Sequence, residues 1–198
     1  MSRGPALRVI AIRNGRFDQN CYLVGADGCA DAGIVDPGEE TDLVLERARE
    51  EGLAIKAIWI THAHIDHVLG VARIHAATDA PIHLHPADRP LYDRVGQQAE
   101  FFGVRADDLP RPTHDLVHGQ ELSVGEARLI VRHTPGHSPG SVCFVSPGVV
   151  IGGDVLFQGS IGRTDLPGGN HAELLASILR DAGMLARLDF GQPVKDMR

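Results

Sequence analysis

The stretch Thr61-His62-Ala63-His64-Ile65-Asp66-His67 holds three histidines and one aspartate within six positions. It directly follows the apolar run 54–60, which predicts a buried strand. On an extended backbone His62 and His64 point to the same side, and a turn into a helix would swing the aspartate and the last histidine back toward them. Because imidazole and carboxylate are ligands of Zn²⁺, Fe²⁺ and Mn²⁺, the stretch predicts a metal site at a strand end. The alternative is an ordinary surface loop, since the chain contains 11 histidines.

The composition predicts a single-domain globular protein and argues against some classes of binding partner. With 198 residues, 43% of them hydrophobic and 23% charged, the chain is expected to form one domain over 1–198 around one core. The net charge of −7 argues against a nucleic-acid-binding surface and against binding to an anionic membrane. Nothing in the composition favours one oligomeric state over another.

Three cysteines, Cys21, Cys29 and Cys143, occur without a CxxC spacing. This number and spacing predict neither a disulfide framework nor a thiolate zinc site, and they fit a reducing compartment. Residues 1–6 lack the apolar segment and cleavage site of a signal peptide, and no apolar run approaches the ~18 residues of a membrane span. We therefore expect a cytoplasmic location.

Hydrophobic periodicity predicts strands and helices in alternation. Strands are predicted over 7–13, 20–24, 32–36, 54–60, 81–85, 121–124, 127–132, 141–145 and 149–151. Helices are predicted over 39–51, 68–77, around 97–102 and from 170 to 183. Strands outnumber helices, and helices separate some of them, so the pattern favours an α/β sandwich.

Three local features carry their own expectations. The irregular stretch 94–112 predicts either a lid facing the substrate or a surface connection with two buried aromatics. His83 and His85 alternate along a short strand and could be a second ligand pair, but half-buried strand histidines are favoured because no acidic partner lies nearby.

In the last helix we expect Asn170 and Glu173 to form a capping box. We expect its buried stripe to consist of Leu174, Leu175, Ile178 and Leu179.

Two later stretches place metal-type side chains at strand ends. His137 lies in the Pro/Gly-rich turn 134–141, where an unusual backbone would expose the imidazole. Asp154 follows the apolar strand 149–151 through two glycines. Each signal alone is weak, since an aspartate after a strand also forms turns. Three such positions in one chain favour a shared site.

These motifs together resemble the metallo-β-lactamase superfamily. They read HxHxDH over 62–67, TPGHSPGS over 134–141 and GGDVLF over 152–157. The stretch GSIGRTDLPGG over 159–169 is similar to the short glyoxalase II-like hydrolases and to the persulfide dioxygenases. The resemblance covers about 7–183. It implies an αβ/βα sandwich of the metallo-β-lactamase type.

The resemblance also implies a ligand set by matching position. His62, His64 and His137 would hold a first metal, and Asp66 and His67 a second. Asp154 would bridge the two ions. The implied cofactor is one or two zinc ions, with iron or manganese as alternatives. His133, Arg163 and Asp165 lie near the motifs and could support the ligands, with a purely structural role equally open.

The resemblance implies hydrolysis of a small-molecule thioester or ester of the hydroxyacylglutathione type. A metal-bound hydroxide would attack the carbonyl, and Asp66 would act as a catalytic residue that orients the hydroxide and manages the proton. The alternatives are a mononuclear iron persulfide dioxygenase and a catalytically impaired metal-binding protein. No nucleic-acid or membrane partner is expected.

The C-terminus departs from the family pattern. The family usually continues into a strand and a turn with a further histidine for the second metal, whereas the last histidine here is His171. We therefore expect the last strand and terminal helix of the sandwich to be absent or altered within 190–198. The first metal would then bind well and the second weakly.

Overall fold

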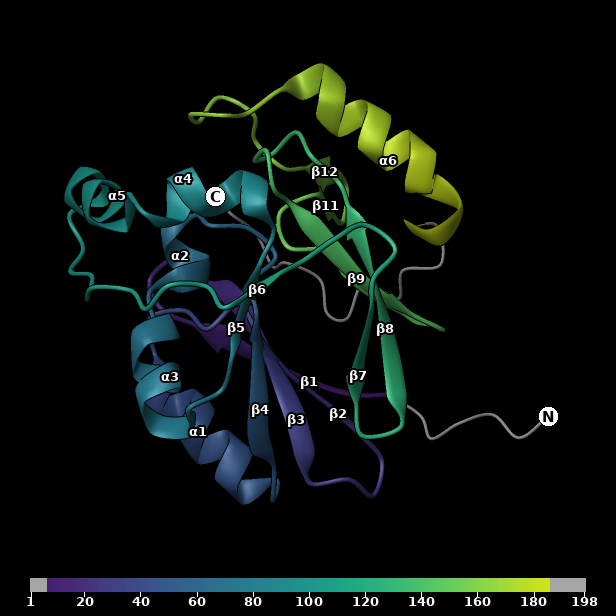
Figure 1. Ribbon diagram of the computed structural model, residues 1–198. Coiled ribbons are helices and arrows are strands. Elements are labelled where there is room, and N and C mark those ends of the chain that lie inside the picture. Colours follow the sequence, from purple (N-terminus) through teal and green to yellow (C-terminus); the bar gives the residue numbers. More distant parts are fainter. Residues whose placement is uncertain (1–6, 186–198) are drawn as a thin grey trace.

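The computed structural model describes residues 7–185, in which two β-sheets face each other and helices cover their outer faces (Figure 1). Helices α1 and α3 lie against one sheet, and α6 lies on the far side of the other. This arrangement confirms the predicted α/β sandwich. Within residues 7–185 no helix has the length and apolar character needed to cross a membrane. The expected change at the C-terminus concerns residues outside the described range.

The larger sheet has six strands in sequence order. They are β1 (Leu7–Asn14), β2 (Gln19–Ala26), β3 (Asp31–Val35), β4 (Ala54–Trp59), β5 (Ile82–Leu84) and β6 (His114–Asp115). The pairs β1–β2 and β2–β3 are antiparallel, whereas β3 to β6 run parallel. The carboxyl ends of β3, β4 and β5 therefore meet at one edge, and β4 leads into the histidine-rich stretch at that edge.

The second sheet has four antiparallel strands in the order β10-β9-β8-β7. They are β7 (Glu121–Val124), β8 (Ala127–His133), β9 (Val142–Ser146) and β10 (Val149–Ile151). The short hairpin of β11 (Leu156–Phe157) and β12 (Ser160–Ile161) follows. The sequence did not predict β6, β11 or β12, because two residues are too few to show an alternating pattern.

Seven helical segments complete the described chain. They are α1 (Thr41–Glu50), α2 (Ile65–Val68), α3 (Val71–Thr78), the 3₁₀ segment η1 (Pro86–Asp88), α4 (Arg89–Tyr92), α5 (Val95–Phe102) and α6 (His171–Leu185). The helix predicted over 68–77 is in fact split between α2 and α3 at Gly70. A side chain there would collide with Thr41 and the carbonyl of Gly38, so the chain turns at this close contact.

Apolar side chains fill the space on both faces of the larger sheet. Trp59 of β4 and Phe144 of β9 meet between the sheets, with ring centroids 6.2 Å apart. On the other face Ile34 and Ile58 pack with Val44 of α1 in a separate cluster. The edge between the two clusters carries the polar side chains described below.

The buried stripe predicted for α6 is wrong in half of its members. Leu174 is fully buried, but Leu175 and Leu179 are 40% and 74% exposed. The helix instead buries a narrow face that includes Ser177, whose hydroxyl donates to the Pro135 carbonyl at 2.8 Å. Hydrogen bonds to the 133–136 segment thus replace part of the expected apolar contact. The helix also continues past its predicted end at Gly183.

The predicted capping box forms only in part. Asn170 Oδ1 accepts the Glu173 N–H at 3.2 Å, as expected for an N-cap. The Asn170 N–H donates to the carbonyl of Gly136 at 2.7 Å, where a box would use the Glu173 side chain. The start of α6 is therefore tied to the turn that carries His137.

The stretch 94–112 contains α5, but its two aromatics are not buried. Phe101 is 80% and Phe102 38% exposed. The Phe102 and Phe17 rings form a T-shaped pair with centroids 5.8 Å apart. Of the two alternatives for this stretch, the surface connection with two buried aromatics is therefore wrong in its buried pair.

Candidate metal centre

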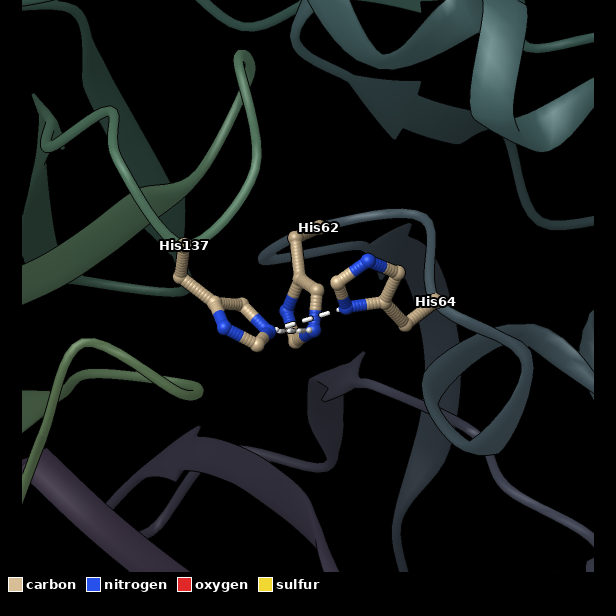
Figure 2. A group of neighbouring side chains, drawn as sticks. All are labelled: His62, His64 and His137. Atoms are coloured by element: carbon tan, nitrogen blue, oxygen red, sulfur yellow. Dashed lines mark hydrogen bonds between the residues drawn. The ribbon is translucent and has the colours of Figure 1, made fainter. Parts of the chain in front are cut away.

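Three imidazoles meet where the two sheets come together. His62 and His64 lie between the end of β4 and the start of α2, and His137 lies in the turn between β8 and β9. Figure 2 shows the three rings turned toward one another from these two loops. All three are at least nine-tenths buried. Residues 75 positions apart in the sequence therefore form one cluster, as the strand-end argument predicted.

The ring nitrogens of this cluster lie within contact distance. His137 Nε2 is 3.1 Å from His62 Nε2 and 2.9 Å from His64 Nδ1. The Thr61 hydroxyl donates to Asp36 at 2.6 Å, so it must accept from His62 Nδ1 at 3.0 Å. His62 therefore carries its proton on Nδ1 and a lone pair on Nε2.

The same reasoning fixes the tautomer of His137. Its Nδ1 donates to the carbonyl of Arg163 at 2.7 Å, which leaves a lone pair on Nε2. The close contact between His62 and His137 thus sets two lone pairs against each other. A proton on His64 Nδ1 could satisfy one of them at most, and its Nε2 has no hydrogen-bond partner among the described residues.

A bound cation resolves this conflict better than an added proton. Burial, followed by the neighbouring imidazoles, holds the pKa of His62 well below its ordinary value. Burial likewise lowers the pKa of His64 to about 4. At neutral pH both rings are neutral and present lone pairs to one point. This donor set fits a divalent metal ion.

A second group adjoins the first. His67 Nδ1 donates to Asp36 at 2.9 Å, so a neutral His67 ring would carry its lone pair on Nε2. That nitrogen lies 3.4 Å from Asp66 Oδ2 and 3.3 Å from Asp154 Oδ1. The other oxygen of Asp154 is 3.7 Å from His137 Nε2. Asp154 therefore stands between the two groups, at the position for which the family resemblance implied a bridging carboxylate.

The second group is more open and more acidic than the first. The side chains of Asp66 and Asp154 are 24% and 30% exposed. Burial opposes the charge on His67, but Asp66, Asp36 and Asp154 outweigh it and raise the pKa of His67 well above its ordinary value. Burial likewise opposes ionisation of Asp66, but His67 lowers the pKa of that carboxyl to about 2. The group thus attracts positive charge, which a second ion could supply.

Asp36 orients histidines of both groups and was missed by the sequence reasoning. It is fully buried and accepts from the Thr61 N–H at 2.7 Å, from the Thr61 hydroxyl and from His67. Its φ of 52° lies in the left-handed region, which is uncommon for a residue with a side chain. Its position directly after β3 was the available signal, because the predicted ligands also follow strands.

Gly153 shows why the segment before Asp154 is glycine-rich. Its φ is 49°, and an added Cβ would lie 2.5 Å from the Thr61 hydroxyl. The 152–154 turn must therefore pass directly over the histidine-rich stretch. This contact brings Asp154 within reach of both groups.

The other singled-out residues lie outside the cluster. His83 stacks on His114 and His85 on His133, and neither pair joins a converging group among the described residues. His133 Nε2 donates to the Pro139 carbonyl. Arg163 forms an exposed two-point ion pair with Asp165 and reaches the cluster only through its backbone carbonyl.

The sequence and the fold of the chain match those of a known family. The family model of the metallo-beta-lactamase superfamily matches residues 14–195. The chain belongs to the metallo-β-lactamase superfamily. This membership confirms the predicted fold and the general class of metal-dependent hydrolase-type enzymes.

Relatives within this superfamily share a third or more of their residues with the chain. The probable metallo-hydrolase YqgX of Bacillus subtilis is 38% identical over 83% of this chain and 78% of its own length. The hydroxyacylglutathione hydrolase GloC of Haemophilus influenzae is 35% identical over 82% of this chain and 78% of its own. The crystal structure of TTHA1623 in a di-iron-bound form is 39% identical, with a TM-score of 0.82, and the match covers 89% of this chain and 87% of that one.

Proposed function

We propose that this chain hydrolyses thioesters or related esters with metal ions held by the two histidine–aspartate groups. The observation that carries the proposal is the convergence of lone pairs at His62, His64 and His137, with Asp154 reaching from them to His67. When bound, divalent ions would lower the pKa of a water toward neutrality and polarise the acyl carbonyl. By ligand position the first ion would belong to His62, His64, His137 and Asp154, and the second to Asp66, His67 and Asp154.

Three of the chain's own groups would prepare the site for this reaction. Asp36 fixes the tautomer of His67 directly and that of His62 through Thr61. The Arg163 carbonyl does the same for His137. In their neutral forms His62, His67 and His137 would therefore present their lone pairs without rotation of the rings, which favours a fixed geometry.

Asp66 is the proposed catalytic residue. It lies at the more open side of the centre, and its low pKa keeps the carboxylate ionised at neutral pH. It can accept a hydrogen bond from the attacking water and transfer that proton toward the departing thiol or alcohol. The role needs an ionised group that solvent can reach, and the Asp66 side chain is ionised and 24% exposed.

The choice of a thioester rests on a relative. The relative from Haemophilus influenzae is named for hydroxyacylglutathione hydrolysis, and it aligns over most of both chains. We extend that substrate class to this chain. Zinc is the proposed ion, with iron as the alternative because the similar structure TTHA1623 was solved with two irons.

Turnover assays on zinc-loaded and iron-loaded protein test the proposal. The substrates are S-lactoylglutathione, a short acyl thioester without the glutathione peptide, and glutathione persulfide with oxygen. The proposal expects thioester cleavage that is lost in Asp66→Asn while the first ion, held by His62, His64, His137 and Asp154, is retained. Persulfide oxidation with iron alone would support a dioxygenase instead. No turnover with filled sites would support a metal-binding protein without this activity.

A further inference from the structure

Asp88 is a fully buried carboxylate that touches none of the metal-type side chains through a hydrogen bond of its own. It ends the 3₁₀ segment η1. Its Oδ2 accepts from the Ala63 N–H at 2.8 Å and from the Ser138 hydroxyl at 2.7 Å, and its Oδ1 accepts from the Gly140 N–H at 2.6 Å. None of these donors carries a formal charge. A buried carboxylate without a cationic partner is costly, so its bonds need an explanation.

The three bonds join the two loops that carry the imidazole cluster. Ala63 lies between His62 and His64, and Ser138 directly follows His137. One carboxylate therefore fixes the distance between the backbones from which the three rings converge. Gly140 permits this approach, because an added Cβ there would lie 2.7 Å from Asp88.

A second side chain holds the same loop from the other side. Gln98 of α5 accepts the Ile65 N–H at 3.1 Å and donates to the Ala63 carbonyl at 3.0 Å. With Asp88, both backbone polar groups of Ala63 are bound by side chains from 86–102. The sequence predicted that the segment 94–112 is either a lid or a surface connection. Through Gln98, this segment supports the histidine loop.

We propose that Asp88 is a positioning residue that holds the two histidine loops at the separation needed for a metal ion. The inference rests on the proposed function only in that the imidazole cluster binds metal. Asparagine cannot replace it, although the shape is the same. Whichever way the amide is turned, its NH₂ group would face the N–H of Ala63 or of Gly140. One loop would be released, and the ring nitrogens would move apart.

The test compares Asp88→Asn with Tyr92→Phe. Tyr92 is a buried residue of the neighbouring helix α4, and its hydroxyl donates to the Pro110 carbonyl at 2.8 Å, away from both histidine loops. Metal affinity is measured by competition with a chromophoric chelator, geometry by the visible spectrum of the Co²⁺-loaded protein, and stability by thermal unfolding of the metal-free protein. We expect Asp88→Asn to weaken metal binding about tenfold or more and to alter the Co²⁺ spectrum. Tyr92→Phe should lower only the unfolding temperature.

An Asp88→Asn protein with metal affinity within about twofold of the parent and an unchanged Co²⁺ spectrum would overturn the inference. If this variant does not fold, Ser138→Ala removes one of the three donors, and Ser177→Ala removes a buried hydroxyl bonded to the same turn at Pro135. Ser138→Ala should weaken metal binding several-fold, and Ser177→Ala should not. Equal effects would again contradict the inference. Absence of metal binding in the parent would instead refute the proposed function.

Discussion

Two groups of histidines in this chain differ in how their rings meet. His62, His64 and His137 present their edges, with ring nitrogens 2.9 and 3.1 Å apart. The His83–His114 and His85–His133 pairs stack face to face, with interplanar angles of 21° and 12°. Stacked rings direct their nitrogens sideways, so the pairs offer no common point to an ion. Ring orientation, which for His62 and His137 is set by a hydrogen bond at the other nitrogen, therefore distinguishes a candidate metal site from a local excess of histidines.

The substitution His137→Ala should have the largest effect. It removes one of three converging imidazoles, so the first ion should be lost. We expect kcat/KM for thioester hydrolysis to fall about 10³-fold, since a bound metal supplies several kcal/mol of transition-state stabilisation. Steady-state kinetics with elemental analysis would measure both effects. Full activity with a full metal content would show that the cluster is not the centre.

Asp36→Asn should have a smaller effect that falls unequally on the two metal groups. Asp36 contacts His67 directly but reaches His62 only through Thr61. We expect metal affinity to fall by about 10- to 100-fold, more for the second ion than for the first. Calorimetric titration of the metal-free protein would resolve the two steps. The control is Asp165→Asn, which alters only the exposed pair with Arg163 and should leave both affinities unchanged.

His83→Phe should leave the metal unaffected and change only the response of stability to pH. Burial, followed by the neighbouring His114, lowers the pKa of folded His83 to about 4, whereas an unfolded histidine titrates near ~6.5. The unfolded state therefore binds the proton more readily, and stability is lost as the pH falls from about 6.5 to 4. Phenylalanine keeps an aromatic ring in the stack, and His83 Nδ1 has no hydrogen-bond partner to lose among residues 7–185. The melting temperature of the metal-free variant should fall less over this range than that of the parent. An identical pH profile would contradict this.

The sequence predicted those parts of the site that depend on local pattern. His62, His137 and Asp154 each follow an apolar strand, and the carboxyl ends of such strands are where polar side chains gather in this fold. The role of Asp88 could not be predicted from the sequence, because its hydrogen-bond partners lie 25 to 52 residues away and no periodicity marks them. The same holds for Gln98, which is 35 residues from Ala63.

The errors in the fold have the same origin. Leu175 and Leu179 match a helical apolar stripe, yet α6 is attached by Asn170 and Ser177 to the turn that carries His137. Hydrogen bonds to a distant loop decided which face is buried, and apolar spacing does not report them. The strands β6, β11 and β12 were not predicted, because two residues are too few to show an alternating pattern. The expected loss of a second-site ligand concerns 190–198, which lie outside the described residues.

Zinc titration of chelator-treated protein, with ions counted and affinities resolved, tests the central claim most directly. The parent should bind a first ion tightly and a second more weakly, because among the described residues the first group has four ligand side chains and the second has three, Asp154 being shared. His137→Ala should lose the tight ion, and His83→Phe should keep it. A tight ion that survives His137→Ala, or that is lost in His83→Phe, would contradict the assignment of the metal to the converging histidines.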